Sequence, residues 1–266
     1  MTDKKIFDRL NNDMDYLKNK GFEVLGVFLQ GSQNYHLDYE GSDIDTKAIV
    51  LPSFRDFILN KQPVSTTLVL ESNEHIDVKD IRLMFDCFKK QNINFIEILF
   101  TEYFILNEEY KDIYQPMLDN AEKVAHYNNY AAINCMVGMV LEKRKAMEHP
   151  YPTLIDKIGK YGYDPKQLHH ILRCREFLIR YIDGVPYREC LIPTHPDDLI
   201  RVKRTPPLFT LDEARSLAEA NEKCVLGLKE AYMKSNECVV DHDVEKLMSD
   251  VLYNALKHNF KKEIND

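Results

Sequence analysis

Two apolar segments, separated by polar residues in a fixed order, constrain the fold of this chain more than any other feature. The first segment, residues 22–30, is rich in Val, Leu and Phe and ends directly at Gly31 and Ser32. The second begins with Asp43 and Asp45 around an isoleucine and continues as an apolar run to residue 51. Short runs of aliphatic and aromatic residues are typical of buried strands. The sequence therefore predicts two core strands, with a Gly-Ser pair after the first and two acids at the start of the second.

Helices and short strands alternate through the rest of the first half. Apolar residues at helical spacing predict a helix over residues 3–20, which Gly21 ends, and another over residues 80–91. The β-rich runs 64–70 and 75–79 are joined by a polar turn and predict a hairpin. A small sheet of about three to five strands follows from these elements.

From about residue 107 onward the pattern is mostly helical. Helices are expected near residues 107–120, 125–147, 165–183, 210–234 and 241–259. Residues 184–208 hold five of the 11 prolines and are expected to be irregular. The predicted fold class is α/β of the α+β kind, with a small mixed-sheet domain over residues 1–120 and a helical C-terminal domain over residues 121–266 packed on it.

The net charge of −8 over 266 residues is unevenly distributed. Residues 1–125 contain 14 basic and 22 acidic side chains, whereas residues 126–266 contain 21 of each. Residues 143–204 are locally basic, with 13 Lys or Arg against eight Asp or Glu. An acidic protein does not bind nucleic acid through bulk electrostatics. A polyanionic ligand would therefore need metal ions or the local basic segment.

Cysteine spacing and hydropathy predict the compartment. The six cysteines lie far apart, without a Cys-x-x-Cys or a Cys/His pair at zinc spacing, and are expected to be thiols in a reducing environment. No run of about 18 apolar residues occurs, so no membrane partner is expected. The predicted localisation is cytoplasmic.

Asp43 and Asp45 are the first candidate site residues. Residues i and i+2 of a strand point to the same side, so the two carboxylates project together and repel each other unless a cation lies between them. Hard oxygen ligands favour Mg²⁺ or Mn²⁺. Gly31 and Ser32 offer backbone N–H groups and a hydroxyl at a helix start, which suits a phosphate. The combination predicts a nucleoside triphosphate site.

Asp77, between two apolar residues of the predicted hairpin, is a third acid that can share a metal or accept a proton. Taken singly, these pieces are weak, because Asp-x-Asp is often a solvated turn and Gly-Ser is a common loop dipeptide. Their order along the chain is what points to a site.

Four residues of the helix predicted over residues 165–183 share one face. They are Lys166, His169, His170 and Arg173, at i, i+3, i+4 and i+7. Two permanent cations and two histidines on one face can bind phosphates. The alternative interpretation is a solvated face with half-buried histidines.

With these residues in place, the chain resembles the nucleotidyltransferase superfamily of DNA polymerase beta. More narrowly, it is similar to the predicted bacterial and phage nucleotidyltransferases of that superfamily, which are often linked to RNA repair. The matching segments are Gly-Ser-x-x-Tyr at residues 31–35, Ser-Asp-Ile-Asp at 42–45, Asn-x-x-x-x-Glu at 92–97, and Gly-Tyr-Asp-x-Lys-x-x-x-His-x-x-Arg at 162–173. Three positions depart from the family pattern: His36 in place of Gly, Lys47 in place of a small or apolar residue, and Ile93 in place of Pro.

The resemblance implies an enzyme that transfers a nucleoside monophosphate from a nucleoside triphosphate, such as ATP, to an acceptor hydroxyl and releases pyrophosphate. It implies that residues 1–120 are the catalytic domain. Asp43, Asp45 and Asp77 would be the catalytic residues and the ligands of two Mg²⁺ or Mn²⁺ ions. The nucleotide-binding residues would be Gly31, Ser32, Ser42, Lys166, His170 and Arg173.

The sequence does not determine the class of the acceptor or whether the protein turns over substrate. An RNA 3′ end, a DNA end, a protein hydroxyl and a small molecule all suit the chemistry, and the basic segment favours an RNA end. One alternative is a non-catalytic nucleotide sensor or antitoxin-like partner with the same fold. A glycosyltransferase that uses Asp-x-Asp for its metal fits poorly, because it leaves the Gly-Ser pair without a role.

Overall fold

The computed structural model describes residues 3–265 and groups them by their contacts into two units. The first unit contains the chain up to Asn34, Glu40–Tyr127 and the chain from Val240 onward, and the second contains Tyr35–Tyr39 and Asn128–Val239. The final helix therefore groups with the sheet, in contrast to the expected ranges 1–120 and 121–266. As functional domains, those ranges remain a prediction.

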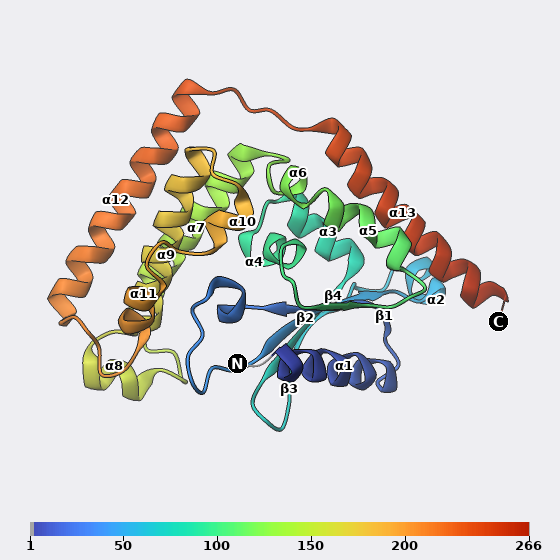
Figure 1. Cartoon of the computed structure of the whole chain (residues 1–266), viewed down its shortest axis with the longest axis horizontal. Coiled ribbons are helices and arrows are strands. Elements are labelled where there is room, and N and C mark those ends of the chain that lie inside the picture. The colour runs from blue at the N-terminus through green and yellow to red at the C-terminus, as the bar shows by residue number, and fades with distance from the viewer. Residues whose placement is uncertain (1–2, 266) are drawn as a thin grey trace. The chain divides into compact units, whose positions relative to one another are not determined.

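A five-stranded mixed sheet forms the centre of the first unit (Figure 1). Its strands lie in the order β3-β4-β2-β1-β5. The central neighbours β2 and β4 are parallel, and the other neighbouring pairs are antiparallel. The strands are β1 (Glu23–Gln30), β2 (Asp45–Leu51), β3 (Ser65–Val69), β4 (His75–Asp80) and β5 (Phe104–Leu106).

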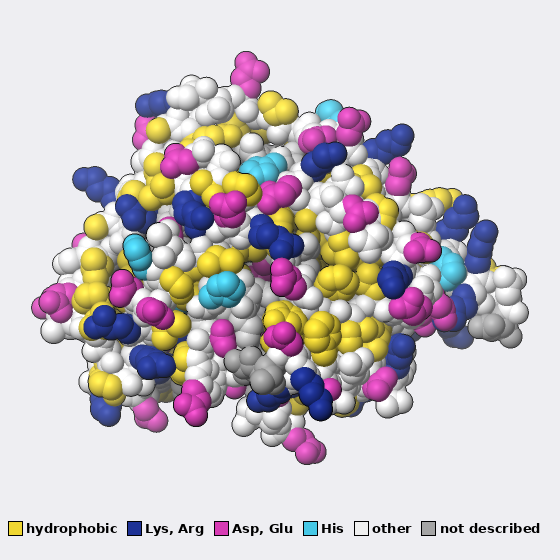
Figure 2. Space-filling model, viewed as in Figure 1, with side chains coloured by type: hydrophobic (Ala, Val, Ile, Leu, Met, Phe, Trp, Pro, Cys, Tyr) yellow, Lys and Arg dark blue, Asp and Glu magenta, His cyan; other side chains and the backbone are white. Residues whose placement is uncertain are grey.

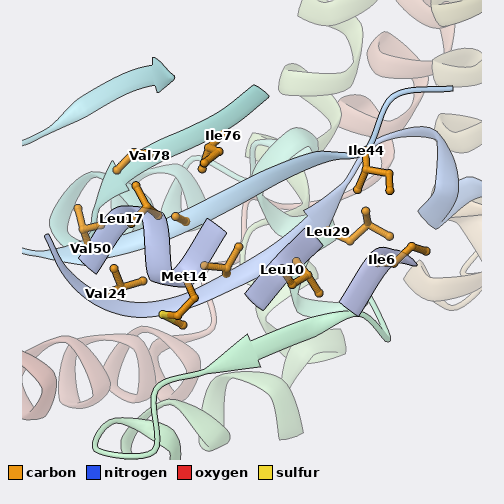
Figure 3. Packing of buried hydrophobic residues seen from close by; sticks show 12 residues of the cluster. Ile6, Leu10, Met14, Leu17, Val24, Leu29, Ile44, Val50, Ile76 and Val78 are labelled. Atoms are coloured by element: carbon orange, nitrogen blue, oxygen red, sulfur yellow. The ribbon is translucent and has the colours of Figure 1, made fainter. Parts of the chain in front are cut away.

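Helix α1 (Asp3–Asn19) covers one face of this sheet. Its buried apolar residues recur every three or four positions and pack against the strands (Figure 3); they are Ile6, Leu10, Met14 and Leu17. They pack against the inward side chains of β1, β2 and β4, including Val24, Val50 and Val78. Gly21 (φ +83°) ends the helix in the left-handed conformation that glycine adopts without strain.

The other elements of the first unit are mostly short, and the C-terminal helix α13 (His242–Asn265) is the long one. They are η1 (Ser32–Tyr35, whose last residue belongs to the second unit), α2 (Phe54–Ile58), α3 (Ile81–Lys89), α4 (Ile93–Ile96), η2 (Glu97–Leu99), α5 (Lys111–Asp119) and α6 (Ala121–Ala125). α13 packs on α2, α3, α5 and β2. The buried Asn259 side chain fixes it by donating to the Pro52 carbonyl at 2.9 Å and accepting from the Tyr110 hydroxyl at 3.1 Å.

The second unit is helical, with α9 (Pro165–Ile182) as its central element. α9 packs against α7 (Asn129–Ala146), α10 (Tyr187–Leu191), α11 (Pro196–Lys203) and α12 (Leu211–Ser235). The short helix α8 (Ile155–Tyr161) precedes it. As expected from sequence, Asp164 is the N-cap of α9 and accepts a hydrogen bond from the Lys166 N–H, and Pro165 occupies the first turn.

The predicted fold class is confirmed: a small mixed sheet with helices is followed by a mostly helical C-terminal half. One expectation is wrong. Residues 184–208 are not irregular, because α10 and α11 form within them. Pro186 is the N-cap of α10 and Pro196 lies in the first turn of α11, so two of the five prolines start helices. Among the described residues, no helix combines the length and the hydropathy needed to cross a bilayer.

Candidate active site

The Gly-Ser pair lies where β1 turns into the short helix η1. Gly31 has φ +91°, a conformation that strains any residue with a Cβ, although open space surrounds the position itself. Asn34 holds the turn by donating from Nδ2 to the Leu29 carbonyl at 2.9 Å. Ser32 is half-buried, and its Oγ lies 3.5 Å from Gln33 Oε1. The pair therefore forms a fixed turn at the end of a core strand, as predicted.

Asp43 and Asp45 lie on the side of their segment opposite Ile44. Ile44 is 1% exposed and packs toward α1, whereas Asp43 is exposed and the Asp45 side chain is 39% exposed. Ser42, half-buried, directly precedes them. A hydrogen bond of 2.6 Å from Gln33 Nε2 to the Asp43 carbonyl joins this segment to the Gly-Ser turn. The structure thus brings the predicted phosphate turn and the two acids together.

The turn before β4 positions these acids through two neighbouring residues. Glu74 Oε1 accepts from the Ile44 N–H at 3.2 Å. His75 donates its backbone N–H to Asp45 Oδ1 at 3.1 Å, and its Nδ1 lies 3.3 Å from the same oxygen. The Asp43 side chain and Asp45 Oδ2 have no hydrogen-bond partner among residues 3–265. These three carboxylate oxygens are the donor atoms that the structure leaves available for a cation.

Asp77 lies on the same face of the sheet but has an internal partner. The parallel register places Lys47 of β2 directly beside Asp77 of β4, and Lys47 Nζ lies 2.6 Å from Asp77 Oδ2. The Lys47 ammonium also lies 3.9 Å from the centre of the Phe95 ring. Burial lowers the pKa of Lys47, and the adjacent Asp77 carboxylate opposes that shift. The third predicted acid is therefore engaged by a buried lysine.

Consistent with this pairing, the described residues contain no group of three or more His, Cys, Asp or Glu side chains arranged to hold a metal ion. The three predicted ligands do not form a single acidic cage. Two accessible carboxylates still fit Mg²⁺ or Mn²⁺, since such ions are usually bound by one or two carboxylates together with substrate phosphates.

The predicted basic residues of α9 belong to the second unit. Lys166 is exposed, His170 is half-buried and Arg173 is 7% exposed. Burial, with Arg173 and His169 nearby, lowers the pKa of His170 well below its usual range, so this imidazole is neutral at pH 7. His169, on the same helix face, is buried and donates from Nδ1 to the Leu199 carbonyl at 2.9 Å. The histidines are therefore neutral groups and do not add to the charge of the two cations.

Sequence reasoning missed the roles of Glu74 and His75. Their contacts with residues 44 and 45 depend on the parallel pairing of β2 with β4, which the sequence does not reveal. The available clue was the acid and the histidine in the polar turn directly before the strand that contains Asp77.

Comparisons with known proteins do not assign this site to a family. A scan against protein-family models finds no match, and a search of curated proteins finds no significant similarity.

Proposed function

We propose that the protein is a metal-dependent nucleotidyltransferase that transfers a nucleoside monophosphate from a nucleoside triphosphate to an acceptor hydroxyl. The observation that supports this most strongly is the grouping at the end of β1 and the start of β2. A left-handed Gly-Ser turn is tied by Gln33 to a segment with two accessible carboxylates on one side. A phosphate turn beside a pair of cation ligands suits a triphosphate and its metal.

In this proposal Asp43 and Asp45 would hold Mg²⁺ or Mn²⁺ together with the triphosphate, and Asp77 would contribute to a second ion. The metal supplies positive charge to the triphosphate and lowers the pKa of the acceptor hydroxyl. His75 keeps Asp45 oriented through its two contacts with Oδ1. The Gly31 N–H and the Ser32 hydroxyl donate hydrogen bonds to the β and γ phosphates.

The transfer exchanges one phosphorus–oxygen bond for another and moves one proton. The acceptor oxygen forms a bond to the α phosphorus, the bond from that phosphorus to the β-phosphate oxygen breaks, and pyrophosphate leaves with the electron pair. The acceptor proton passes to Asp77, which lies on the same sheet face as Asp45. An RNA 3′ hydroxyl is the acceptor class we favour, because residues 143–204 have a basic excess.

Transfer is tested by incubating the protein with α-labelled ATP, GTP, CTP or UTP, with Mg²⁺ or Mn²⁺, and with RNA, protein or small-molecule acceptors. We expect label in one acceptor class, and loss of labelling in Asp45→Asn. Asp86→Asn, an exposed acid of α3, is the matched control and should transfer at the wild-type rate. Absence of label from every acceptor, or wild-type transfer by Asp45→Asn, would contradict the proposal.

The Lys47–Asp77 pair favours one alternative, a nucleotide sensor without turnover, because a permanently engaged Asp77 cannot act as a base. The two functions are separated by calorimetry combined with the transfer assay. Metal-dependent triphosphate binding in the absence of any product would identify the sensor.

A further inference from the structure

The second unit contains four cations placed together by the packing of α9 on α11. We call Lys166, Arg173, Lys203 and Arg204 the basic cluster. The hydrogen bond from His169 to the Leu199 carbonyl joins the two helices. Arg173 lies one helical turn after His169 on α9, and Lys203 lies one helical turn after Leu199 on α11. Lys203 also donates to the Leu37 carbonyl of the segment Tyr35–Tyr39.

Arg173 is the member whose environment is most unusual. The residue is 7% exposed, and its guanidinium carbon lies 4.0 Å from the centre of the Tyr35 ring. Within the described chain it forms no ion pair and no side-chain hydrogen bond. A guanidinium has five N–H donors, and a buried charge is normally paired or bound to a ligand. Arg173 is therefore a largely buried cation without a protein acceptor among the described residues, and its donors remain available to a ligand.

The cations of the basic cluster repel one another. Burial, together with the charges of Lys166, Arg173 and Arg204, lowers the pKa of Lys203 to about 8, and the Asp38 carboxylate opposes this shift. Lys203 and Arg204 lie 4.9 and 4.7 Å from the centre of the Tyr39 ring. Positive charge is thus concentrated around Lys203, and Asp38 is the carboxylate that partly compensates it.

Several other basic side chains in this unit have an acidic partner. Lys143 lies 2.9 Å from Glu142, and Arg144 contacts both Glu148 and Glu219. Acidic and basic side chains are likewise interspersed over the face drawn in Figure 2. The basic cluster differs from these pairs because its cations face one another.

We propose that the basic cluster is a phosphate-binding site of the second unit, with Arg173 and Lys203 as its principal ligands. Its ligand is a phosphate monoester or polyphosphate, as found in a nucleotide or at a phosphorylated RNA end. Such a group would supply acceptors for the Arg173 donors and relieve the repulsion among the cations. The site needs neither a metal nor the three carboxylates of the first unit, so phosphate binding at the basic cluster can be measured separately from nucleotidyl transfer.

Binding is measured by titration calorimetry on the full chain in EDTA, with inorganic pyrophosphate as the probe. We expect saturable binding that weakens by about tenfold or more in Arg173→Gln and in Lys203→Met, since each removes charge-assisted hydrogen bonds. Lys203→Met keeps the test valid if replacement of the buried arginine impairs folding, which thermal unfolding of each variant will show. Arg175→Gln on α9 and Arg201→Gln on α11 are exposed matched controls and should bind like the wild type.

Further arms identify the source of the phosphate and separate this site from the proposed enzyme activity. ATP and an oligoribonucleotide with or without a 5′ phosphate are compared with pyrophosphate, and preference for ATP or for the phosphorylated oligomer supports the site and names its ligand. Asp45→Asn should bind pyrophosphate normally, even if transfer fails. Absence of binding by every phosphate probe would overturn the proposal. Equal weakening by the Arg175 and Arg201 variants would overturn it as well.

Discussion

At the scale of single residues, Lys47 decides how Asp77 can act. The lysine is buried, 2.6 Å from the carboxylate and packed on the Phe95 ring. The lysine ammonium neutralises the negative charge of the Asp77 carboxylate, which a metal ion would otherwise do. The sequence predicted that Asp43 and Asp45 share a side, because strand alternation is a local property. It did not predict the Lys47–Asp77 pair, because that pair arises from the register between two strands distant in sequence.

Replacing Lys47 by Met tests this competition directly. We expect Lys47→Met to bind Mn²⁺ more tightly by about five- to tenfold, roughly 1 kcal/mol, because Asp77 then lacks an internal cation. The measurement is a Mn²⁺ titration followed by electron paramagnetic resonance. Lys79→Met is the matched control, since Lys79 lies on the same face and near the same ring but bonds to Ser65. Equal effects of both variants would show that Asp77 does not contribute to the metal site.

Glu74 is expected to position the acids without binding the ligand. Its Oε1 accepts from the Ile44 N–H, and its other oxygen contacts Arg9 and the Ser72 hydroxyl. Glu74→Ala should weaken Mn²⁺ binding by about tenfold, because a fixed carboxylate pair becomes mobile. Glu74→Gln retains an acceptor for Ile44 and should recover most of the affinity. Failure of Gln to recover binding while the variant remains folded would mean that the charge of Glu74, and not its hydrogen bond, matters.

His36 adopts a backbone conformation that is uncommon for a residue with a Cβ atom. Its φ is +56°, in the left-handed region that glycine adopts most easily. A glycine would adopt this conformation without strain, and the histidine adopts it with an exposed side chain.

At the scale of elements, the boundaries of α9 were predicted to within one residue, but the burial of His169 was not. Helical spacing placed His169 and Arg173 on one face. Spacing alone does not reveal that α11 covers that face, because residues 184–208 were expected to be irregular. His169 is buried by α11, which lies in residues 184–208. The prolines of that segment led to the prediction of irregular structure, although two of them start helices.

The buried His169 makes the stability of the second unit depend on pH. Burial lowers the pKa of His169 to about 3, against the hydrogen bond to Leu199. The unfolded chain takes up this proton near pH 6.5 whereas the folded chain does not, so stability is lost as the pH falls from about 6.5 toward 3. The loss is roughly 1.4 kcal/mol per pH unit for this group.

His169→Gln keeps a donor for Leu199 and removes the titration. Between pH 6.5 and 5, the wild type should therefore lose about 2 kcal/mol more stability than the variant. Hydrogen exchange of the α9 amides measures this difference within the second unit. His170 is present in both proteins, so its contribution to the pH dependence of stability cancels in the comparison. Parallel stability curves for the two proteins would contradict the burial of a neutral His169.

At the scale of the whole molecule, the chain does not divide at one point. Tyr35–Tyr39 belongs to the second unit although it lies between the Gly-Ser turn and the two acids, and α13 belongs to the first unit although it ends the chain. Helix spacing predicted α13 but gave no information on its partners. The helix makes polar and aromatic contacts with residues roughly 150 to 210 positions earlier, among others.

Removal of α13 should unfold the first unit and leave the second one folded. The helix supplies Asn259, which satisfies the Pro52 carbonyl and bonds to Tyr110, and Phe260, whose ring packs on Phe54 and Phe57. Truncation after residue 239 exposes these groups and costs several kcal/mol, about as much as losing two or three large buried side chains. We expect the first unit's amides to lose protection from hydrogen exchange, while α7 and α9 amides keep theirs. Ile264→Ala, at an exposed position of the same helix, should leave exchange unchanged. A truncated chain whose sheet amides stay protected would show that α13 is dispensable for the unit that contains Asp43 and Asp45.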